Sequence, residues 1–258
     1  MTDAVQVAPE YPGMRVQPSI GAGLVLYVGY LAIFFTTWVV NDVDYPTIGD
    51  TTRSTKLHYA MPTLLGCVFL VIALTVMGWW KITLFDKERS GPRWAWIGPI
   101  SMGLIALGAF VLMDKDASAE LVMWSVLGAI GVGFGEEMIT RGSLLVGLRT
   151  KYTEVKVWLF STLAFSALHL PNMLFGQDVG PTIGQVVLTF LFGSLLWATR
   201  RLSGTLLLCM FLHGFWDSSV FLPDATGSDV YALPFLIYPI ALACAIGVLR
   251  KNRGLRLG

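Results

Sequence analysis

The sequence predicts an all-α polytopic membrane protein, and its composition and its long apolar runs support this. Of the 258 residues, 55% are hydrophobic and 14% are charged, and the mean hydropathy is +0.66. Soluble domains carry about 25% charged residues. Several runs reach the roughly 20 apolar residues needed to cross a hydrocarbon core about 30 Å thick. We therefore expect the chain to lie in a lipid bilayer.

The apolar runs predict about eight transmembrane helices. Four runs are free of charged side chains: Ile20–Val40, Ala60–Trp80, Trp94–Met113 and Tyr231–Leu249. Four more candidates lie between them: Leu121–Leu148, Val157–Leu170, Thr182–Thr199 and Leu202–Leu222. We expect one helical domain over 20–249 with its chemistry in 121–222, a polar tail over 1–19 and a basic tail over 250–258.

The cationic residues predict the orientation of these spans. With eight spans, fourteen lysines and arginines fall on the side of both termini, and three fall on the other side. Because cytoplasmic loops carry the excess of Lys and Arg, both termini are expected in the cytoplasm. The net charge of +1 with no basic groove argues against nucleic-acid binding. The expected location is the plasma membrane of a bacterium.

The fourth predicted span contains three ionisable side chains, Glu136, Glu137 and Arg141. Each would cost about 3 kcal/mol at the centre of a membrane helix, so such groups face a protein interior or a wet cavity. A purely structural explanation is an ion pair of Glu137 with Arg141, four residues apart on one helix face. That pair leaves Glu136 without a partner, which favours a functional site.

Later spans add histidines to this group. His169 lies in the fifth span, and His213 and Asp217 lie four residues apart in the seventh. At 1.5 Å per residue from the cationic, cytoplasmic span ends, Glu137, His169 and His213 all lie roughly 18 to 20 Å deep, so they can converge. This depth favours access from the cytoplasm if a cavity opens on that side. His58 precedes the second span and is interpreted as an interfacial loop residue.

A carboxylate and neutral imidazoles at one level can activate water. The carboxylate can serve as a general base, and fixed donors can stabilise a developing oxyanion. Glycines at 131, 133 and 135 precede this group and allow close helix packing. A hydrolase is therefore the leading hypothesis.

Three motifs in separate spans give the sequence a resemblance to a known family. These are EEMITR, which fits E-E-x-x-x-R; FSALH, which fits F-x-x-x-H; and HGFWD, a histidine followed four residues later by Asn or a similar residue. Over roughly 131–222 the chain resembles the CPBP family, the CAAX protease and bacteriocin-processing intramembrane proteases. This family is also called the ABI or type II CAAX prenyl endopeptidase family.

The resemblance implies a role for each motif residue. Glu136 would be the base acting on water, and His169 would hold that water. His213 and Asp217 would stabilise the oxyanion, and Glu137 and Arg141 would form a supporting pair. Asp217 departs from the family's Asn. An ionised Asp cannot donate a hydrogen bond, so it would be protonated by burial, orient His213 or bind a metal.

The sequence leaves the cofactor and the substrate open. His169, His213 and one or two carboxylates satisfy the ligand count of a catalytic zinc, and the family is commonly labelled metalloprotease. No H-E-x-x-H motif is present, and a mechanism with no cofactor fits equally. The expected partners are the bilayer and a membrane-associated protein or peptide, such as a lipidated C-terminus or a secreted-peptide precursor.

Two other functional classes fit the same residues. A proton-coupled transporter would use the Glu and His side chains as a relay, but the ionisable residues stop at one layer and no internal repeat is visible. A non-catalytic membrane scaffold would keep the fold and bind a partner. The intramembrane endopeptidase is favoured because the three motifs and the common depth agree.

Overall fold

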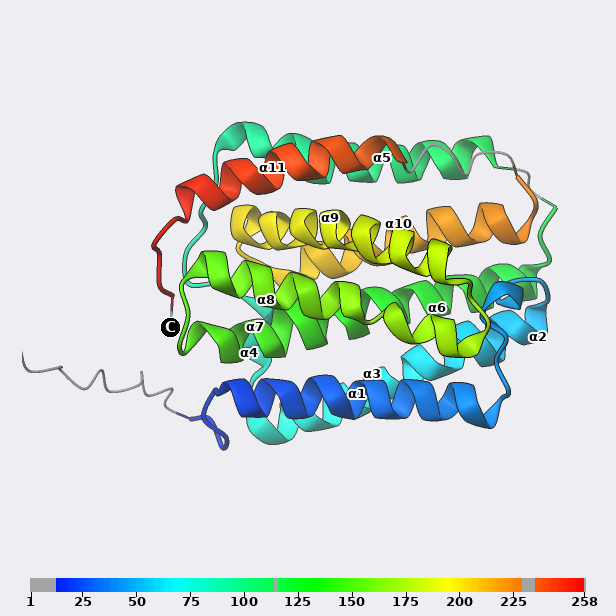
Figure 1. Ribbon diagram of the computed structural model, residues 1–258, viewed down its shortest axis with the longest axis horizontal. Coiled ribbons are helices and arrows are strands. Elements are labelled where there is room, and N and C mark those ends of the chain that lie inside the picture. Colours follow the sequence, from blue (N-terminus) through cyan, green and yellow to red (C-terminus); the bar gives the residue numbers. More distant parts are fainter. Residues whose placement is uncertain (1–12, 114–115, 229–234, 258) are drawn as a thin grey trace, which may run out of the picture.

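The computed structural model describes residues 13–113, 116–228 and 235–257, and its long helices run side by side along one axis (Figure 1). The long helices are α1 (Ile20–Val40), α3 (Met61–Met77), α5 (Ile97–Leu112), α6 (Ala119–Glu137), α8 (Glu154–Ala167), α9 (Val179–Ser203), α10 (Leu206–Ala225) and α11 (Ile237–Lys251). Shorter segments are η1 (Tyr45–Thr47), α2 (Thr52–Ser54), η2 (Thr55–Ala60), α4 (Trp80–Leu84), η3 (Arg93–Trp96), η4 (Met138–Leu144), α7 (Leu145–Arg149) and η5 (Leu170–Phe175). Within the described residues there is no strand, only an isolated bridge between Phe85 and Thr205.

Seven helical segments in the described ranges are long and apolar enough to cross a membrane. The prediction of an all-α polytopic membrane protein is therefore confirmed. The first span has the predicted bounds, and the fourth runs as one segment over Ala119–Arg149. The eighth predicted span begins at Tyr231, outside the described residues, and its described part is α11, which packs along α9 and α5.

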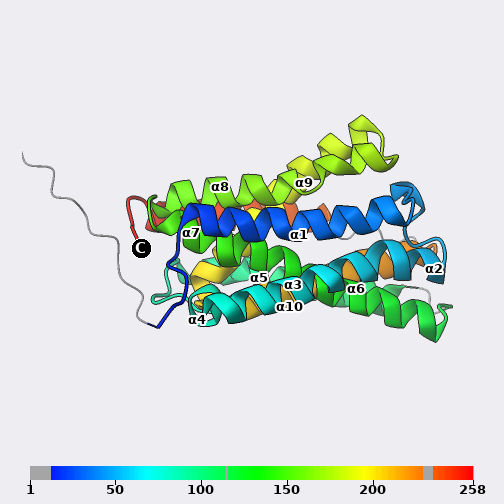
Figure 2. The ribbon, with the colours of Figure 1, turned by 90° about the horizontal axis from the view of Figure 1, so that it is seen from below.

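The helices form layers around α6 and α10. In Figure 1, α11 and α5 lie at one face and α1 and α3 at the opposite face, with α9, α10, α8 and α6 between them. The view turned by 90° shows α8 and α9 along one edge and α3 and α6 along the other, with α1 between the two edges (Figure 2). Exposed Leu, Val and Ile side chains cover the outer helices, as a bilayer requires.

Three glycines let neighbouring helices approach α6 closely. A Cβ at Gly133 would lie 2.7 Å from the backbone nitrogen of Gly214 on α10, and one at Gly135 would lie 2.6 Å from the Tyr30 hydroxyl on α1. A Cβ at Gly131 would collide with Thr63 on α3. Small residues allow such backbone contacts in membrane bundles. The predicted packing role of these glycines agrees with this, and it sets α6 against three partners.

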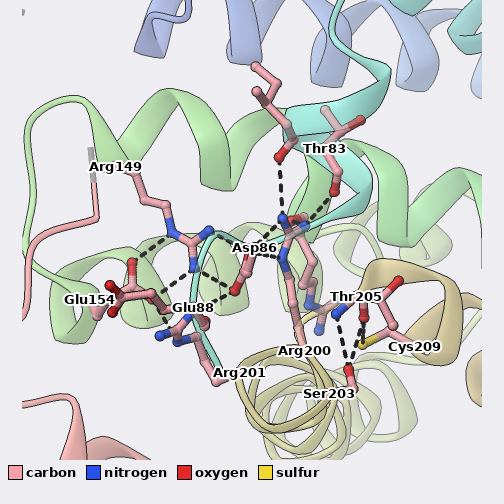
Figure 3. A network of polar contacts seen from close by, with 12 residues as sticks. Thr83, Asp86, Glu88, Arg149, Glu154, Arg200, Arg201, Ser203, Thr205 and Cys209 are labelled. Atoms are coloured by element: carbon pink, nitrogen blue, oxygen red, sulfur yellow. Dashed lines mark hydrogen bonds and ion pairs between the residues drawn. The ribbon is translucent and has the colours of Figure 1, made fainter. Parts of the chain in front are cut away.

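One end of the bundle, the arginine end, holds a buried ion network of Asp86, Arg149, Glu154, Arg200 and Arg201, here called the arginine cluster (Figure 3). Arg149 donates to Asp86 at 2.7 Å and 3.2 Å and to Glu154 at 2.7 Å and 3.0 Å. Arg200 donates to Asp86 at 2.9 Å and Arg201 donates to it at 2.5 Å. The side chain of Asp86 is fully buried.

The arginine cluster shows that three of the cations counted as loop residues do not lie in loops. Arg149, Arg200 and Arg201 contributed to the fourteen cations counted in loops, but they lie inside helices and pair with carboxylates. The seventh span accordingly begins at Leu206 rather than Leu202, after a turn at Gly204 with a φ of +74°. The remaining eleven cations still outnumber those of the other side, so the expected orientation keeps its support.

Electrostatics keep Asp86 ionised. Burial alone would raise the pKa of Asp86, but the guanidinium groups of Arg200, Arg149 and Arg201 hold this pKa well below its usual range. Arg200 also donates to the backbone carbonyls of Thr83, at 2.8 Å, and of Arg141. The cluster therefore ties α4, α9 and the segment η4 together.

The described parts of both tails pack against the bundle. Trp79 donates its indole N–H to the carbonyl of Val16 at 2.8 Å, and the Ser19 hydroxyl accepts from the amide of Ala22 to cap α1. The amide of Glu154 donates to the carbonyl of Leu255 at 2.9 Å. Residues 1–12 and 258 of the predicted tails lie outside the described residues.

Candidate active site

Adjacent glutamates end helix α6, and they face different surroundings. Glu137 has no solvent exposure and accepts a hydrogen bond from Arg141 at 2.8 Å. Glu136 is partly exposed and lies on the wall of a cavity. The structure thus forms the expected Glu137 and Arg141 pair and leaves Glu136 as the carboxylate that faces the cavity.

His213 on α10 lies against the same ion pair. Its Nδ1 is 3.0 Å from Oε1 of Glu137, the oxygen that also accepts from Arg141. A carboxylate partner at Nδ1 fixes the ring and places the proton on that nitrogen. Nε2 of His213 is then the nitrogen available for chemistry.

Asp217 does not orient His213 by the predicted hydrogen bond. Its Oδ2 is 3.7 Å from Nε2 of His213, which is within ion-pair range but too long for a hydrogen bond. One helical turn separates the two residues, and the shorter contact goes to Glu137 across the helix interface. Asp217 keeps 27% of its side chain exposed and lies on the cavity wall.

Phe165 packs among the charged and imidazole side chains. Its ring centroid lies 5.9 Å from that of His169 and 5.6 Å from that of His213, both in edge-to-face geometry. The guanidinium carbon of Arg141 lies 3.8 Å from the same centroid, a cation–π contact. The phenylalanine of the FSALH motif therefore has a packing role that the sequence reading did not assign.

A cavity of about 400 Å³ connects the predicted site residues. Glu136, His169, His213 and Asp217 all line it, and they come from α6, from the residue directly before η5, and from α10. Much of the remaining wall is aromatic: Tyr30, Phe34, Phe35, Trp38, Tyr45, Tyr59, Phe165, Phe192, Trp216, Phe221 and Tyr238. The four candidate residues thus share this cavity, and Glu137, which was predicted at the same depth as the two histidines, contacts His213.

The cavity extends away from the arginine end. Its wall includes exposed Pro46 and Asp224, at the end of the bundle where α1 is joined to α2 and α10 ends. No member of the arginine cluster lines it. The expected cytoplasmic access depended on a cavity at the arginine end, and the cavity runs to the other end.

Sequence reasoning missed several residues on this wall. His58 lies in the helical segment η2 and lines the cavity, so its interpretation as a loop residue was wrong. Segment η2 continues into α3, which extends the second span towards residue 52. Asn172 donates to Gln185 at 3.1 Å, and Gln185 donates to Tyr45 at 3.1 Å, which joins η5, α9 and η1. A polar Gln within a predicted span was the available signal.

The described side chains do not form a metal-binding site. Among the described residues, no three His, Cys, Asp or Glu side chains gather as metal ligands. Nδ1 of His213 is engaged with Glu137, so only Nε2 of that ring could serve as a ligand. We therefore derive no catalytic step through a metal, and the cofactor question is left to measurement.

Comparison with known proteins agrees with this geometry. No curated protein sequence matches the chain. Residues 118–219 match the model of the family described as Rce1-like, type II CAAX prenyl endopeptidase Rce1-like. This range contains all three motifs and supports an intramembrane protease at the level of the family. The resemblance predicted from the motifs is thus confirmed, since the stretch 118–219 of this integral membrane protein is similar to the Rce1-like type II CAAX prenyl endopeptidases.

Proposed function

We propose that this protein is an intramembrane endopeptidase that hydrolyses a peptide bond of a membrane-associated protein or peptide, with lipidated, CAAX-type C-termini among the candidate substrates. The observation that carries the proposal is the shared cavity wall of Glu136, His169, His213 and Asp217. A general base, imidazoles and an enclosed space are the parts that water activation needs.

The first step is attack by water on the scissile carbonyl. His169 holds the water, and the carboxylate of Glu136 removes one of its protons as the oxygen bonds to the carbonyl carbon. The carbonyl oxygen becomes an oxyanion. His213, protonated at both nitrogens, donates from Nε2 to that oxyanion and from Nδ1 to Glu137, which lies 3.0 Å away.

The second step breaks the carbon–nitrogen bond. Glu136 returns its proton to the leaving nitrogen, which departs as an amine and leaves a carboxylic acid. Asp217 places a carboxylate 3.7 Å from Nε2 of His213 and stabilises the imidazolium by charge rather than by donation. Arg141 holds Glu137 in place at 2.8 Å. Asp217, which stands where the family has Asn, thus has a role that an ionised carboxylate can fill.

Cleavage of fluorogenic membrane-associated peptides, lipidated and unmodified, by purified protein in detergent tests the proposal. Glu136→Gln keeps the size of the side chain but removes the base, and we expect no turnover above background. Glu120→Gln is the matched control, because Glu120 lies on the same helix outside the cavity and should retain activity. A parallel chelator arm reports metal dependence. Full activity of the folded Glu136→Gln protein would refute the assigned base.

A further inference from the structure

The far end of the cavity is acidic. Seven described carboxylates belong to the connections and helix ends at this end of the bundle, here called the acidic end: Asp42, Asp44, Asp50, Asp116, Glu120, Asp178 and Asp224. Only Arg53 and Lys56 oppose them among the described cations of these segments. Asp224 is exposed and lines the cavity, and Asp217 lies about two turns deeper on the same helix.

Four residues of the cavity wall carry buried hydrogen-bonding atoms that have no partner among the protein atoms. The hydroxyl of Tyr30, a residue only 1% exposed, has no partner among the protein atoms. The same holds for the hydroxyl of Tyr59 and for Nδ1 of His58 and of His169. All four residues lie on the cavity wall. Buried polar groups are normally paired, so these groups suit the carbonyls of a bound peptide or the waters that it displaces.

Aromatic side chains complete the wall at the catalytic level. Phe192 packs on His213 with ring centroids 5.2 Å apart and on Trp216 at 5.6 Å. Trp38 lies farther towards the acidic end and donates its indole N–H to the carbonyl of His58 at 2.8 Å. This surface favours an apolar side chain close to the scissile bond.

We propose that the preferred substrate of this site is an extended peptide with an apolar side chain next to the scissile bond and a lysine or arginine a few residues away. The inference rests on the peptidase function proposed above. The apolar side chain lies among Phe192 and Trp216, and the cationic side chain lies at Asp224. A peptide with glutamate at that position meets the like charge of Asp224 and binds more weakly.

The test compares matched peptides with one apolar core and Lys, Gln or Glu at the flanking position. With the wild-type protein we expect kcat/KM to fall from Lys to Gln to Glu by about two- to fivefold per step, the size of a partly exposed ion pair. The difference should lie in KM and shrink at high salt. Asp224→Asn should remove most of the advantage of Lys over Gln. Asp178→Asn is the control, because Asp178 lies at the same end but not on the cavity wall, and it should leave the ratio unchanged.

Failure of this inference differs from failure of the peptidase function. Equal rates for the three wild-type reactions, or an unchanged Lys to Gln ratio in Asp224→Asn, would overturn the charge preference. If the wild-type protein cleaves none of the peptides, the peptidase function fails. The preference for a cationic side chain is then measured by fluorescence anisotropy, as the binding of the same labelled peptides to wild type and to Asp224→Asn. Tighter binding of the Lys peptide that Asp224→Asn abolishes supports the inference, and charge-independent binding overturns it.

Discussion

The protein contains two buried groups of charged side chains, and they differ in how completely their hydrogen bonds are satisfied. In the arginine cluster, both oxygens of Asp86 accept from guanidinium groups of three arginines, and Nη2 of Arg201 is the one buried side-chain atom of the cluster without a partner among the described residues. At the candidate active site, Oε2 of Glu137, Nε and Nη2 of Arg141, and Nδ1 of His169 have no partner among the protein atoms. Nearly saturated networks hold elements together, whereas unsatisfied groups beside a cavity keep capacity for water and ligand. The comparison assigns stability to the first group and chemistry to the second.

The largest expected effect concerns the side of the membrane from which substrate enters. Because the cationic residues favour a cytoplasmic arginine end and the cavity runs to the acidic end, we expect an external substrate to be cleaved. A membrane-impermeant fluorogenic peptide should be cleaved by right-side-out vesicles and not by sealed inverted vesicles. Detergent should make the two preparations equal, and Glu136→Gln vesicles provide the background. Cleavage only by inverted vesicles would show that the cavity opens to the cytoplasm.

Replacing His169 with Gln should damage activity far more than stability. A group that positions a reacting water contributes about 10² to 10⁴-fold to the rate, so we expect a loss of kcat in that range. The free energy of unfolding should change by less than about 1 kcal/mol, because Nδ1 of His169 has no hydrogen bond to lose. Peptide cleavage and thermal unfolding in the same detergent measure both. A variant that unfolds but keeps its specific activity would make His169 a structural residue.

Replacing Asp86 with Ala should lower the stability of the protein far more than its activity. Three buried guanidinium groups would lose their shared carboxylate, and removing one partner of a buried ion pair costs about 3 to 5 kcal/mol. The melting temperature should therefore fall sharply, while the folded fraction keeps its activity at low temperature. Glu88→Ala is the control, because the Glu88 side chain is exposed two residues away. A stable Asp86→Ala protein with no activity would place Asp86 in the catalytic machinery.

A smaller effect tests how α6 and α10 bring Glu137 and His213 together. In Gly214→Ala the new Cβ would lie 2.7 Å from the carbonyl oxygen of Ala129, so the helices must separate. Overpacking of this kind costs about 1 to 3 kcal/mol, and activity should fall because the 3.0 Å contact lengthens. In Gly184→Ala the Cβ would meet nothing within 4 Å, so this helix should become slightly more stable. Equal behaviour of the two variants in unfolding and cleavage assays would argue against close packing at Gly214.

Much of the fold could be predicted from the sequence because the bilayer restricts it to long apolar helices. Ile20–Val40 was predicted to the residue, since Ser19 supplies a cap and no charge interrupts the run. The start of the seventh span was wrong, because Arg200 and Arg201 were treated as loop residues. Their charges are neutralised by Asp86, which lies more than a hundred positions earlier in the chain. Long-range pairing of this kind is invisible to a local pattern.

At the candidate site, too, the contacts between helices could not be predicted from local sequence patterns. Helical spacing and depth predicted that Glu137, His169 and His213 share a layer. His169 and His213 line the cavity together with Glu136, and Glu137 contacts His213 without lining it. Spacing also suggested that Asp217 orients His213, but Glu137 makes that contact from another helix. Which of two adjacent glutamates faces the cavity, and to which end the cavity runs, depend on how α6 is rotated by its three glycine contacts. No local motif encodes that rotation.

Acid should weaken the arginine cluster in a way that identifies Asp86. Because the arginines lower the pKa of Asp86 in the folded protein, its contribution to stability is complete above the unfolded pKa of about 4 and is lost as the pH falls towards the lower folded value. Below about pH 4 the stability advantage of wild type over Asp86→Asn should shrink by up to about 1.4 kcal/mol per pH unit. Thermal unfolding of both proteins from about pH 6 to about pH 3 measures this gap. Glu88→Gln, which changes an exposed carboxylate two residues away, is measured alongside as the reference. A gap for Asp86→Asn that does not change with pH would mean that the buried carboxylate contributes to stability by packing, and the contrast between a charged structural cluster and a chemically active site would have to be abandoned.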